Sequence, residues 1–299
     1  MEISITGASG FVGQNISTYL EANQHKVHKL SLRTEDWKEA CVKPTDAIIH
    51  LAGKAHDTSN TSGEQEYFKV NRDLTIDVFN AFLLSSTRDF FFFSSVKSVA
   101  DTVEGVLKEE VVANPLTPYG QSKYEAEQYL LKQALPEGKR LFIIRPSMIH
   151  GPGNKGNLNL LYKVVKKGIP WPLAAYHNER SFLSIDNLCY LIEEMLSQQN
   201  LSSGVYNFAD DNTISTNTLV SIISKVLEKK PRLWKLPTGL INNMVKIGDI
   251  LPLPLNSERL KKLTESYVVS NEKIKNALGI EMLPLTAEEG LLKTIKSFK

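Results

Sequence analysis

Short apolar runs alternate with helical periods along the first half of the chain. Runs such as DAIIHLA (46–52) and DFFFFSS (89–95) are apolar at almost every position, which is typical of strands buried on both faces. This alternation predicts a parallel sheet with helices on both sides, a doubly wound α/β fold. Strands are expected at 2–6, 26–32, 46–52, 89–95 and 140–145, and helices at 11–22, 66–86 and 119–135.

Four consecutive phenylalanines occupy positions 90–93. A central strand covered by helices on both faces is the simplest interpretation of such a run. A platform of aromatic rings for a ligand is the alternative.

The pattern changes after Arg145. PSMIHGPGNKGN (146–157) is rich in Gly, Pro and Asn, so it predicts a long loop beside a site. We expect residues 1–150 to form the sheet domain, to which the chain returns at about 180–200, and residues 151–299 to form mainly a smaller, irregular α/β cap for a substrate. Helices are expected in this half at 158–168, 186–198, 215–229 and 238–250, and strands at 180–185 and 204–210.

Composition excludes several classes of function. A net charge of +2 on 299 residues gives no nucleic-acid footprint. The two cysteines, Cys41 and Cys189, form no C-x-x-C pair, which argues against a zinc site and favours a reducing cytoplasm. The chain opens directly into EISIT, so no signal peptide is expected. The apolar stretch 236–255 contains Lys246, Asp249 and prolines, which argue against a transmembrane helix.

ITGASGFVGQNI places Gly7, Gly10 and Gly13 between the first strand and the first helix. Glycine permits a sharp turn and a close approach of the backbone to a pyrophosphate, which the helix N-terminus attracts. A purely structural turn is the alternative. The position after a first strand favours dinucleotide binding.

TPYGQSK places Tyr119 and Lys123 four residues apart, just after Pro118. Residues at this spacing share one face of a helix. A nearby ammonium favours the phenolate, so we expect Lys123 to lower the pKa of Tyr119 from its usual value of about 10. Tyr119 would then be a usable general acid and base.

Several motifs occur in the order found in a known family. The spacing G-x-x-G-x-x-G, DAIIHLAG (46–53), VNRDLT (70–75), FFSSVKS (92–98), YGQSK, RPSMIHGPG (145–153) and RSFLSIDNL (180–188) resemble the extended short-chain dehydrogenases/reductases, the NAD-dependent epimerase/dehydratase family. The resemblance runs to about residue 210 and is only general beyond it. It implies a Rossmann domain, hydride transfer between a nicotinamide and C4 of a nucleotide sugar, and a homodimer built through helices 66–86 and 119–135.

The resemblance also assigns roles to residues. Tyr119 and Lys123 would be catalytic together with Ser95, with Ser94 as the alternative serine, and Lys123 would also hold the nicotinamide ribose. Ser95, Lys97, Asn157 and Arg180 would contact the substrate. The residues expected to hold the cofactor are Gly7, Gly10, Phe11, Val12, Gly13, Arg33, Leu51, Ala52, Gly53, Asn71, Tyr119, Lys123 and Pro146.

The substrate-side residues each have an ordinary structural alternative. Arg180 suits a diphosphate because its guanidinium engages two oxygens at once; a surface arginine paired with Glu179 or a similar acid is the alternative. Asn157 could be a helix N-cap, and Lys97 could face solvent. Three weaker candidates are Lys155 and Arg259 for phosphate or nucleobase and Trp171 for stacking on uracil, although Trp171 could also lie in a core. No metal is expected.

Two features of the sequence predict the reaction. One is a missing pair of acidic residues, which excludes dehydration, and the other is Arg33, which bears on the choice of cofactor. Dehydratases of this family carry an acid pair after the catalytic hydroxyl residue, where this chain has Val96 and Lys97, so dehydration is rejected. No acid stands at the end of the second strand, where Ser31 and Arg33 favour NADP(H) over NAD(H). A solvated surface arginine is the alternative for Arg33, because Glu35 and Asp36 follow closely.

We therefore expect a reductase that acts on a UDP-4-keto-6-deoxy-N-acetylhexosamine in surface-polysaccharide synthesis. Motifs such as GPGNKGNL and KKGIPWPL also resemble those of the enzymes that catalyse this reduction. A UDP-glucose or UDP-N-acetylglucosamine 4-epimerase is the alternative, and a non-catalytic NADP(H) sensor a remote one. The usual V-Y-G after the serine strand is replaced by SVA (98–100), so the loop over the sugar is expected to differ.

Overall fold

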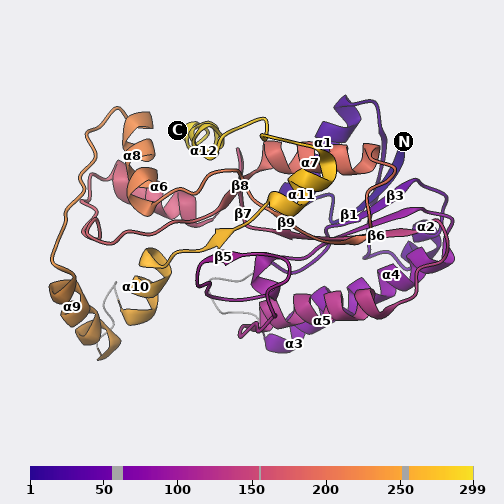
Figure 1. Ribbon diagram of the computed structural model, residues 1–299, viewed down its shortest axis with the longest axis horizontal. Helices are drawn as coiled ribbons and strands as arrows, with labels where there is room; N and C mark the ends of the chain where they lie inside the picture. Colours follow the sequence, from indigo (N-terminus) through magenta and orange to yellow (C-terminus); the bar gives the residue numbers. More distant parts are fainter. Residues whose placement is uncertain (56–62, 155, 251–255, 299) are drawn as a thin grey trace.

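A six-stranded parallel sheet forms the centre of the computed structural model, which describes residues 1–55, 63–154, 156–250 and 256–298 (Figure 1). Its strand order is β2-β1-β3-β4-β6-β9, and every neighbouring pair is parallel. The strands are β1 (Glu2–Thr6), β2 (Lys26–Leu30), β3 (Ala47–His50), β4 (Asp89–Phe93), β6 (Arg140–Pro146) and β9 (Gly204–Phe208). The predicted doubly wound α/β fold is confirmed.

The chain reverses its direction of travel across the sheet at β1. β2 pairs with one side of β1 and β3 with the other. Loops leaving the carboxyl ends of β1 and β3 therefore diverge to opposite faces and leave a crevice between them, the place where doubly wound sheets bind ligands.

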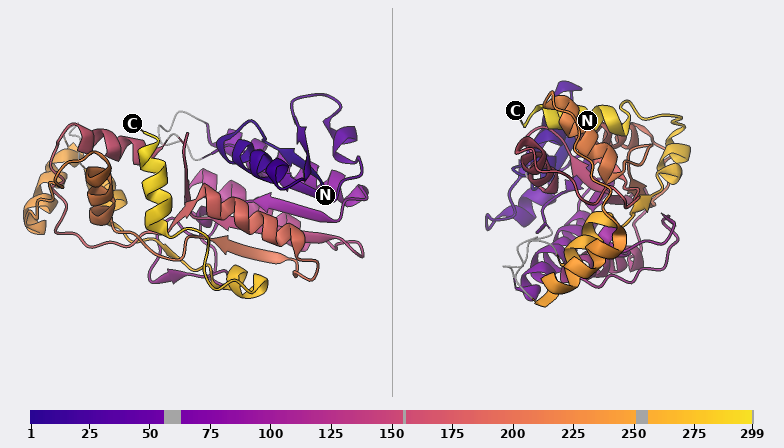
Figure 2. Two further views of the ribbon diagram at one scale, coloured as in Figure 1. Left: turned by 90° about the horizontal axis from the view of Figure 1, so that it is seen from above. Right: turned by 90° about the vertical axis from the view of Figure 1, so that its left-hand side faces the viewer.

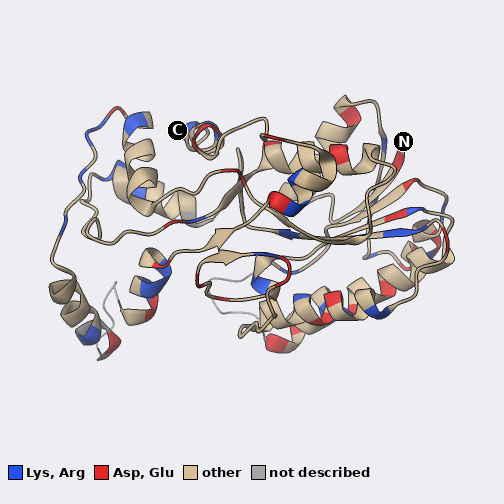
Figure 3. Cartoon of the chain, viewed as in Figure 1, with Lys and Arg blue, Asp and Glu red and all other residues tan. Residues whose placement is uncertain are grey.

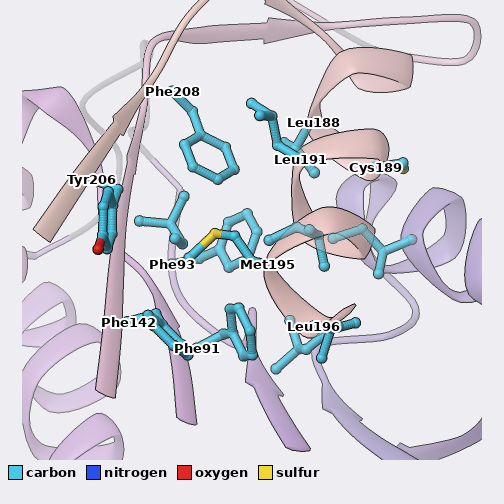
Figure 4. Close-up of a cluster of buried hydrophobic side chains, with 14 of the residues drawn as sticks. Phe91, Phe93, Phe142, Leu188, Cys189, Leu191, Met195, Leu196, Tyr206 and Phe208 are labelled. Carbon is cyan, nitrogen blue, oxygen red and sulfur yellow. The ribbon is translucent and has the colours of Figure 1, made fainter. Parts of the chain in front are cut away.

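Helices cover both faces of the sheet (Figures 1 and 2). One face packs against α1 (Phe11–Ala22) and α7 (Ile185–Ser197), and the other against α2 (Trp37–Cys41), α4 (Leu74–Leu84) and α5 (Pro118–Lys132). Figure 4 shows Phe91 and Phe93 on the α7 side, close to Met195. Phe90 and Phe92 point to the opposite face. The phenylalanine run is thus a buried strand, as its simplest interpretation predicted.

The helix predicted at 66–86 is interrupted. It consists of α3 (Glu64–Tyr67), a π-helical segment (Phe68–Asp73) and α4. Asn71 lies in the π-helical segment and is fully buried. A π turn holds one more residue than an α turn and often occurs at functional sites; hydrophobic periodicity alone did not reveal it.

The second half adds a separate apolar core beyond the sheet. Trp171 belongs to this core, so the alternative interpretation, a core aromatic, is the one observed. Its elements are β7 (Met148–His150), α6 (Asn157–Lys166), β8 (Phe182–Ser184), α8 (Thr216–Val226), α9 (Thr238–Ile250), α10 (Ser257–Thr264) and α12 (Ala287–Lys296).

A two-stranded parallel sheet joins the C-terminal part of the chain to the loop after β4. β10 (Val268–Val269) pairs with β5 (Val106–Leu107) and is followed by α11 (Glu272–Leu278). Tyr267 donates its hydroxyl to the carbonyls of Val96 (3.2 Å) and Ala100 (2.8 Å). The segment in which the family's V-Y-G is missing is therefore held by the C-terminal part of the chain.

His50 makes the fold sensitive to acid. It is fully buried between Thr6, whose hydroxyl is 2.8 Å from Nδ1, and Thr75, 3.0 Å from Nε2. Burial, and to a lesser degree Lys123, lowers its pKa to about 3. In the unfolded chain a histidine has a pKa of about 6.5. Between these values the unfolded state binds more protons, so stability is lost as the pH falls from about 6.5 toward 3.

We expect His50 alone to lower the free energy of unfolding by about 1.4 kcal/mol per pH unit below 6.5. Urea unfolding of the wild type and of His50→Gln at several pH values between neutral and acid measures this slope. The exposed His177 supplies the control His177→Gln. Equal slopes in the wild type and both variants would contradict the prediction.

Candidate active site

The glycine loop lies at the crevice between β1 and β3. Gly7 follows β1 directly and has φ of 68°, a conformation that other residues rarely adopt. A Cβ at Gly7 would lie 2.6 Å from the Ala52 nitrogen, and one at Gly13 would lie 2.4 Å from the Gly7 carbonyl oxygen. The first turn of α1 contains no acidic residue. The loop and this helix N-terminus could therefore hold a pyrophosphate.

Gly13 differs from Gly10 in the space around it. A Cβ at Gly13 meets backbone atoms that cannot rotate away, whereas a Cβ at Gly10 meets nothing closer than 3.4 Å. We expect Gly13→Ala to lower the free energy of unfolding by about 1–3 kcal/mol, because α1 must shift away from the loop. Gly10→Ala is expected to change it much less. Thermal or urea unfolding of both variants tests this; equal losses would contradict it.

The other predicted cofactor residues gather at the same edge. A Cβ at Gly53 would lie 3.0 Å from Asn71 Oδ1 and 3.2 Å from Lys123 Nζ, so the loop after β3 touches α5 and the π-helical segment. Ala52 donates its N–H to Thr6 Oγ1 at 3.2 Å. Phe11 and Val12 begin α1, Leu51 follows β3, and Pro146 ends β6.

Arg33 lies three residues beyond the end of β2 and is exposed. Its backbone N–H donates to Ser31 Oγ at 3.4 Å. Within the described part of the chain its guanidinium has no salt bridge, so neither Glu35 nor Asp36 pairs with it. The side chain is therefore available to a ligand at the end of β2.

Ser95, and not Ser94, faces the tyrosine. Ser95 is extended at the end of β4, accepts the Lys97 N–H at 3.2 Å, and is hydrogen-bonded to the Tyr119 hydroxyl. Ser94 instead donates to Glu127. The geometry therefore shows which of the two serines faces Tyr119, a choice that the sequence left open.

Glu127 is the acceptor of a buried network behind the serines. Besides Ser94 it accepts the Ser98 hydroxyl at 2.6 Å, and Arg145 Nη2 donates to it at 2.5 Å. Glu127 is fully buried and Arg145 nearly so. Sequence reasoning missed Glu127, although it stands four residues after Lys123 and hence on the same helix face.

Tyr119 and Lys123 both stand on the first turns of α5, whose N-cap Thr117 accepts the Gly120 N–H. The expected effect of Lys123 on the tyrosine is wrong. Burial raises the pKa of Tyr119, opposed by the hydrogen bond with Ser95. Lys123 Nζ donates to the Phe93 carbonyl at 2.8 Å, so its charge is directed at β4. Burial also lowers the pKa of Lys123 to about 8, although Glu127 opposes this.

Asn71 links the loop after β3 to the tyrosine helix. Its Oδ1 accepts the Lys54 N–H at 2.7 Å, and its Nδ2 donates to the Lys54 carbonyl and to Ser122 Oγ, both at 3.1 Å. Ser122 in turn donates to the Tyr119 carbonyl at 2.8 Å. In this structure Asn71 therefore fixes the position of the first turn of α5.

Lys97 and Arg180 lie close to one another and are both partly buried. Lys97 Nζ donates to the Asp101 carbonyl at 2.7 Å and lies 4.2 Å from the centre of the Tyr267 ring. Arg180 Nη1 donates to the Lys262 carbonyl at 2.7 Å. Burial lowers the pKa of both groups. Lys97 is thus not a solvated surface lysine.

The remaining substrate candidates are less well defined. The helix N-cap before α6 is Gly156, so the N-cap interpretation of Asn157 is wrong; Asn157 is the first helical residue. Lys155 lies outside the described residues. Arg259 is exposed on α10. In the described part of the chain no group of three His, Cys, Asp or Glu is placed to hold a metal ion.

Comparisons with known proteins give a family match and relatives that cover nearly the whole chain. A model of the NAD dependent epimerase/dehydratase family matches residues 3–209. The UDP-glucose 4-epimerase of Vibrio cholerae is 30% identical over 318 residues, covering 99% of this chain and 95% of the relative. The N-acetyl-alpha-D-glucosaminyl-diphospho-ditrans,octacis-undecaprenol 4-epimerase of Escherichia coli O157:H7 is 26% identical, covering 98% and 94%.

Among solved structures, UDP-glucose 4-epimerase of Thermus thermophilus in complex with NAD aligns with a TM-score of 0.76. The alignment covers 100% of this chain and 99% of the other, at 20% identity. This likeness supports the fold, including the C-terminal part.

Proposed function

Because the chain belongs to the NAD-dependent epimerase/dehydratase family of nucleotide-sugar enzymes, we propose that it inverts the configuration at C4 of a UDP-linked hexose or N-acetylhexosamine. The observation that carries the proposal is the hydrogen-bonded couple of Ser95 and Tyr119, with Lys123 one turn further along α5. Ser95 follows β4 at the same edge of the parallel sheet as the glycine loop after β1. Similarity to 4-epimerases over nearly the whole chain supports epimerisation.

The cradle fits a dinucleotide. Gly7 and Gly13 let the loop pack tightly against Ala52 and against itself, a Cβ at Gly10 would meet nothing closer than 3.4 Å, and the first turn of α1 has no acidic residue. When bound, NAD supplies the group that accepts and returns a hydride, and its oxidised ring carries a positive charge that favours the phenolate of a neighbouring tyrosine.

The chain's own residues would move the proton and hold the sugar. Tyr119 removes the proton from O4 as C4 is oxidised and returns it as C4 is reduced again. Ser95 hydrogen-bonds the same oxygen and keeps it next to Tyr119. Lys123 holds the nicotinamide ribose, and Arg180 with Lys97 forms the positive side of the site against which a diphosphate would rest.

Reduction of a UDP-4-keto-6-deoxy-N-acetylhexosamine is the second candidate. Arg33 favours it, because the free guanidinium after β2 suits the 2′-phosphate of NADP(H). The raised pKa of Tyr119 keeps the phenol protonated, which suits donation of a proton to O4 of a ketone.

A paired assay on the purified protein separates the two reactions. UDP-glucose and UDP-N-acetylglucosamine are incubated with NAD⁺ and the C4 epimers resolved by chromatography; NADPH absorbance is followed with UDP-4-keto-6-deoxy-N-acetylglucosamine. Epimer formation without net consumption of cofactor supports the proposal. Stoichiometric NADPH loss without epimer formation would replace it with the reductase, and Arg33→Ser should then weaken the use of NADPH but not NADH.

A further inference from the structure

The end of the molecule farthest from the sheet, which contains α9, carries exposed apolar side chains (Figure 1). Leu240 and Met244 lie one turn apart on α9 and are each 51% exposed, whereas Ile241 and Val245 point into the core. Trp234 is 55% exposed. Its backbone is held by a ladder, because its N–H donates to the Trp171 carbonyl at 2.8 Å and its carbonyl accepts the Ala174 N–H at 3.2 Å.

The same segment is strongly basic. Residues 229–248 contain Lys229, Lys230, Arg232, Lys235 and Lys246 and no acidic residue. Figure 3 shows this concentration of basic residues along the chain that connects α8 and α9. Within the described residues, none of these side chains forms a salt bridge.

A cavity of about 430 Å³ is lined both by this segment and by a second basic segment, residues 166–169. Its charged lining consists of Lys167, Lys229, Lys230 and Arg232, and Ile169, itself 51% exposed, lies beside them. Four cations around one cavity repel one another unless an anion neutralises them.

We propose that this end of the cap, defined as residues 166–169 and 229–246, docks on an anionic lipid bilayer. The cations match the negative surface of such a membrane, at which each lysine or arginine adds to the affinity. Trp234, Leu240 and Met244 match the interfacial layer, where tryptophan and aliphatic side chains are stable. A small soluble anion would engage the cations but leave the apolar residues exposed.

The contact would be peripheral. Within the described part of the chain, every helix is too short or too polar to cross a bilayer. The membrane would therefore bind only the cap surface.

Sedimentation of the full chain with vesicles tests the proposal. We expect wild-type protein to pellet with vesicles containing phosphatidylglycerol but not with phosphatidylcholine alone, and high salt to weaken the binding. Lys167→Glu/Lys230→Glu should weaken it at least about 20-fold. Both lysines are exposed, so the fold should be retained. Trp234→Ser/Leu240→Ser should weaken it about tenfold or more.

Matched substitutions elsewhere provide the controls. Lys38→Glu/Lys43→Glu makes the same change of charge at exposed sites on the sheet domain, and Met282→Ser removes an apolar residue that is 79% exposed between α11 and α12. Both should pellet like the wild type, and thermal unfolding should show that all variants are folded. The proposal is overturned if the wild type stays in solution with both kinds of vesicle, if the cap variants pellet like the controls, or if tripolyphosphate binds while vesicles do not.

Discussion

Tyr119→Phe is expected to reduce kcat by a factor of about 10²–10⁴, the usual contribution of a positioned general acid and base. The substitution removes one oxygen atom and leaves the ring against Tyr67, with which it forms an edge contact at 6.2 Å between centroids. Ser95 loses its hydroxyl partner but keeps the Lys97 N–H. The fold and the cofactor cradle should therefore be unchanged, and the loss should appear in turnover.

The measurement compares kcat with cofactor affinity in the same preparation. Tyr124→Phe is the matched control, because Tyr124 stands on the same helix five residues further along. We expect it to retain turnover. If Tyr119→Phe retained turnover as well, another group would have to move the proton, and both candidate reactions as described would be wrong.

Glu127→Ala is expected to lower the free energy of unfolding by about 3–5 kcal/mol. It removes the only carboxylate that the structure pairs with Arg145 in its described part, which leaves a guanidinium charge buried next to β4. The hydroxyls of Ser94 and Ser98 lose their acceptor at the same time. Such a change should also displace Ser95, so activity should fall even where the protein remains folded.

Glu125→Ala provides the comparison on the same helix. Glu125 is exposed and pairs with Arg72 at 2.7 Å, a surface salt bridge worth about 0–1 kcal/mol. Urea unfolding of the two variants should therefore give clearly different losses. Equal losses would mean that Arg145 is neutralised in another way.

The sheet and the glycine turn after its first strand could be predicted from the sequence because they depend on the local pattern of residues. Continuous apolar runs identify buried parallel strands, and the glycine at position 7 marks the end of the first of them. Tyr119 and Lys123 were predicted to share a helix face for the same reason, their spacing.

Features that depend on contacts between distant segments could not be predicted. The direction of the Tyr119 pKa shift depends on burial by other elements and on where Lys123 Nζ points, which is toward the Phe93 carbonyl. The role of Glu127 depends on Arg145, from another strand. The hydrogen bonds of Asn71 in the π-helical segment involve the backbone of Lys54 and Ser122, which are distant in sequence. Side-chain spacing within one segment contains none of this information.

The ladder of β5 with β10 has a consequence for synthesis on the ribosome. The loop that follows Ser95 is held by Tyr267 and by residues 268–269, which are translated long after it. Strand β9, which covers the edge of β6, also arrives late. The loop after Ser95 therefore cannot gain these contacts until nearly the whole polypeptide has emerged. Premature termination before residue 267 would release a chain that contains Ser95, Tyr119 and Lys123 but lacks the segment that holds this loop.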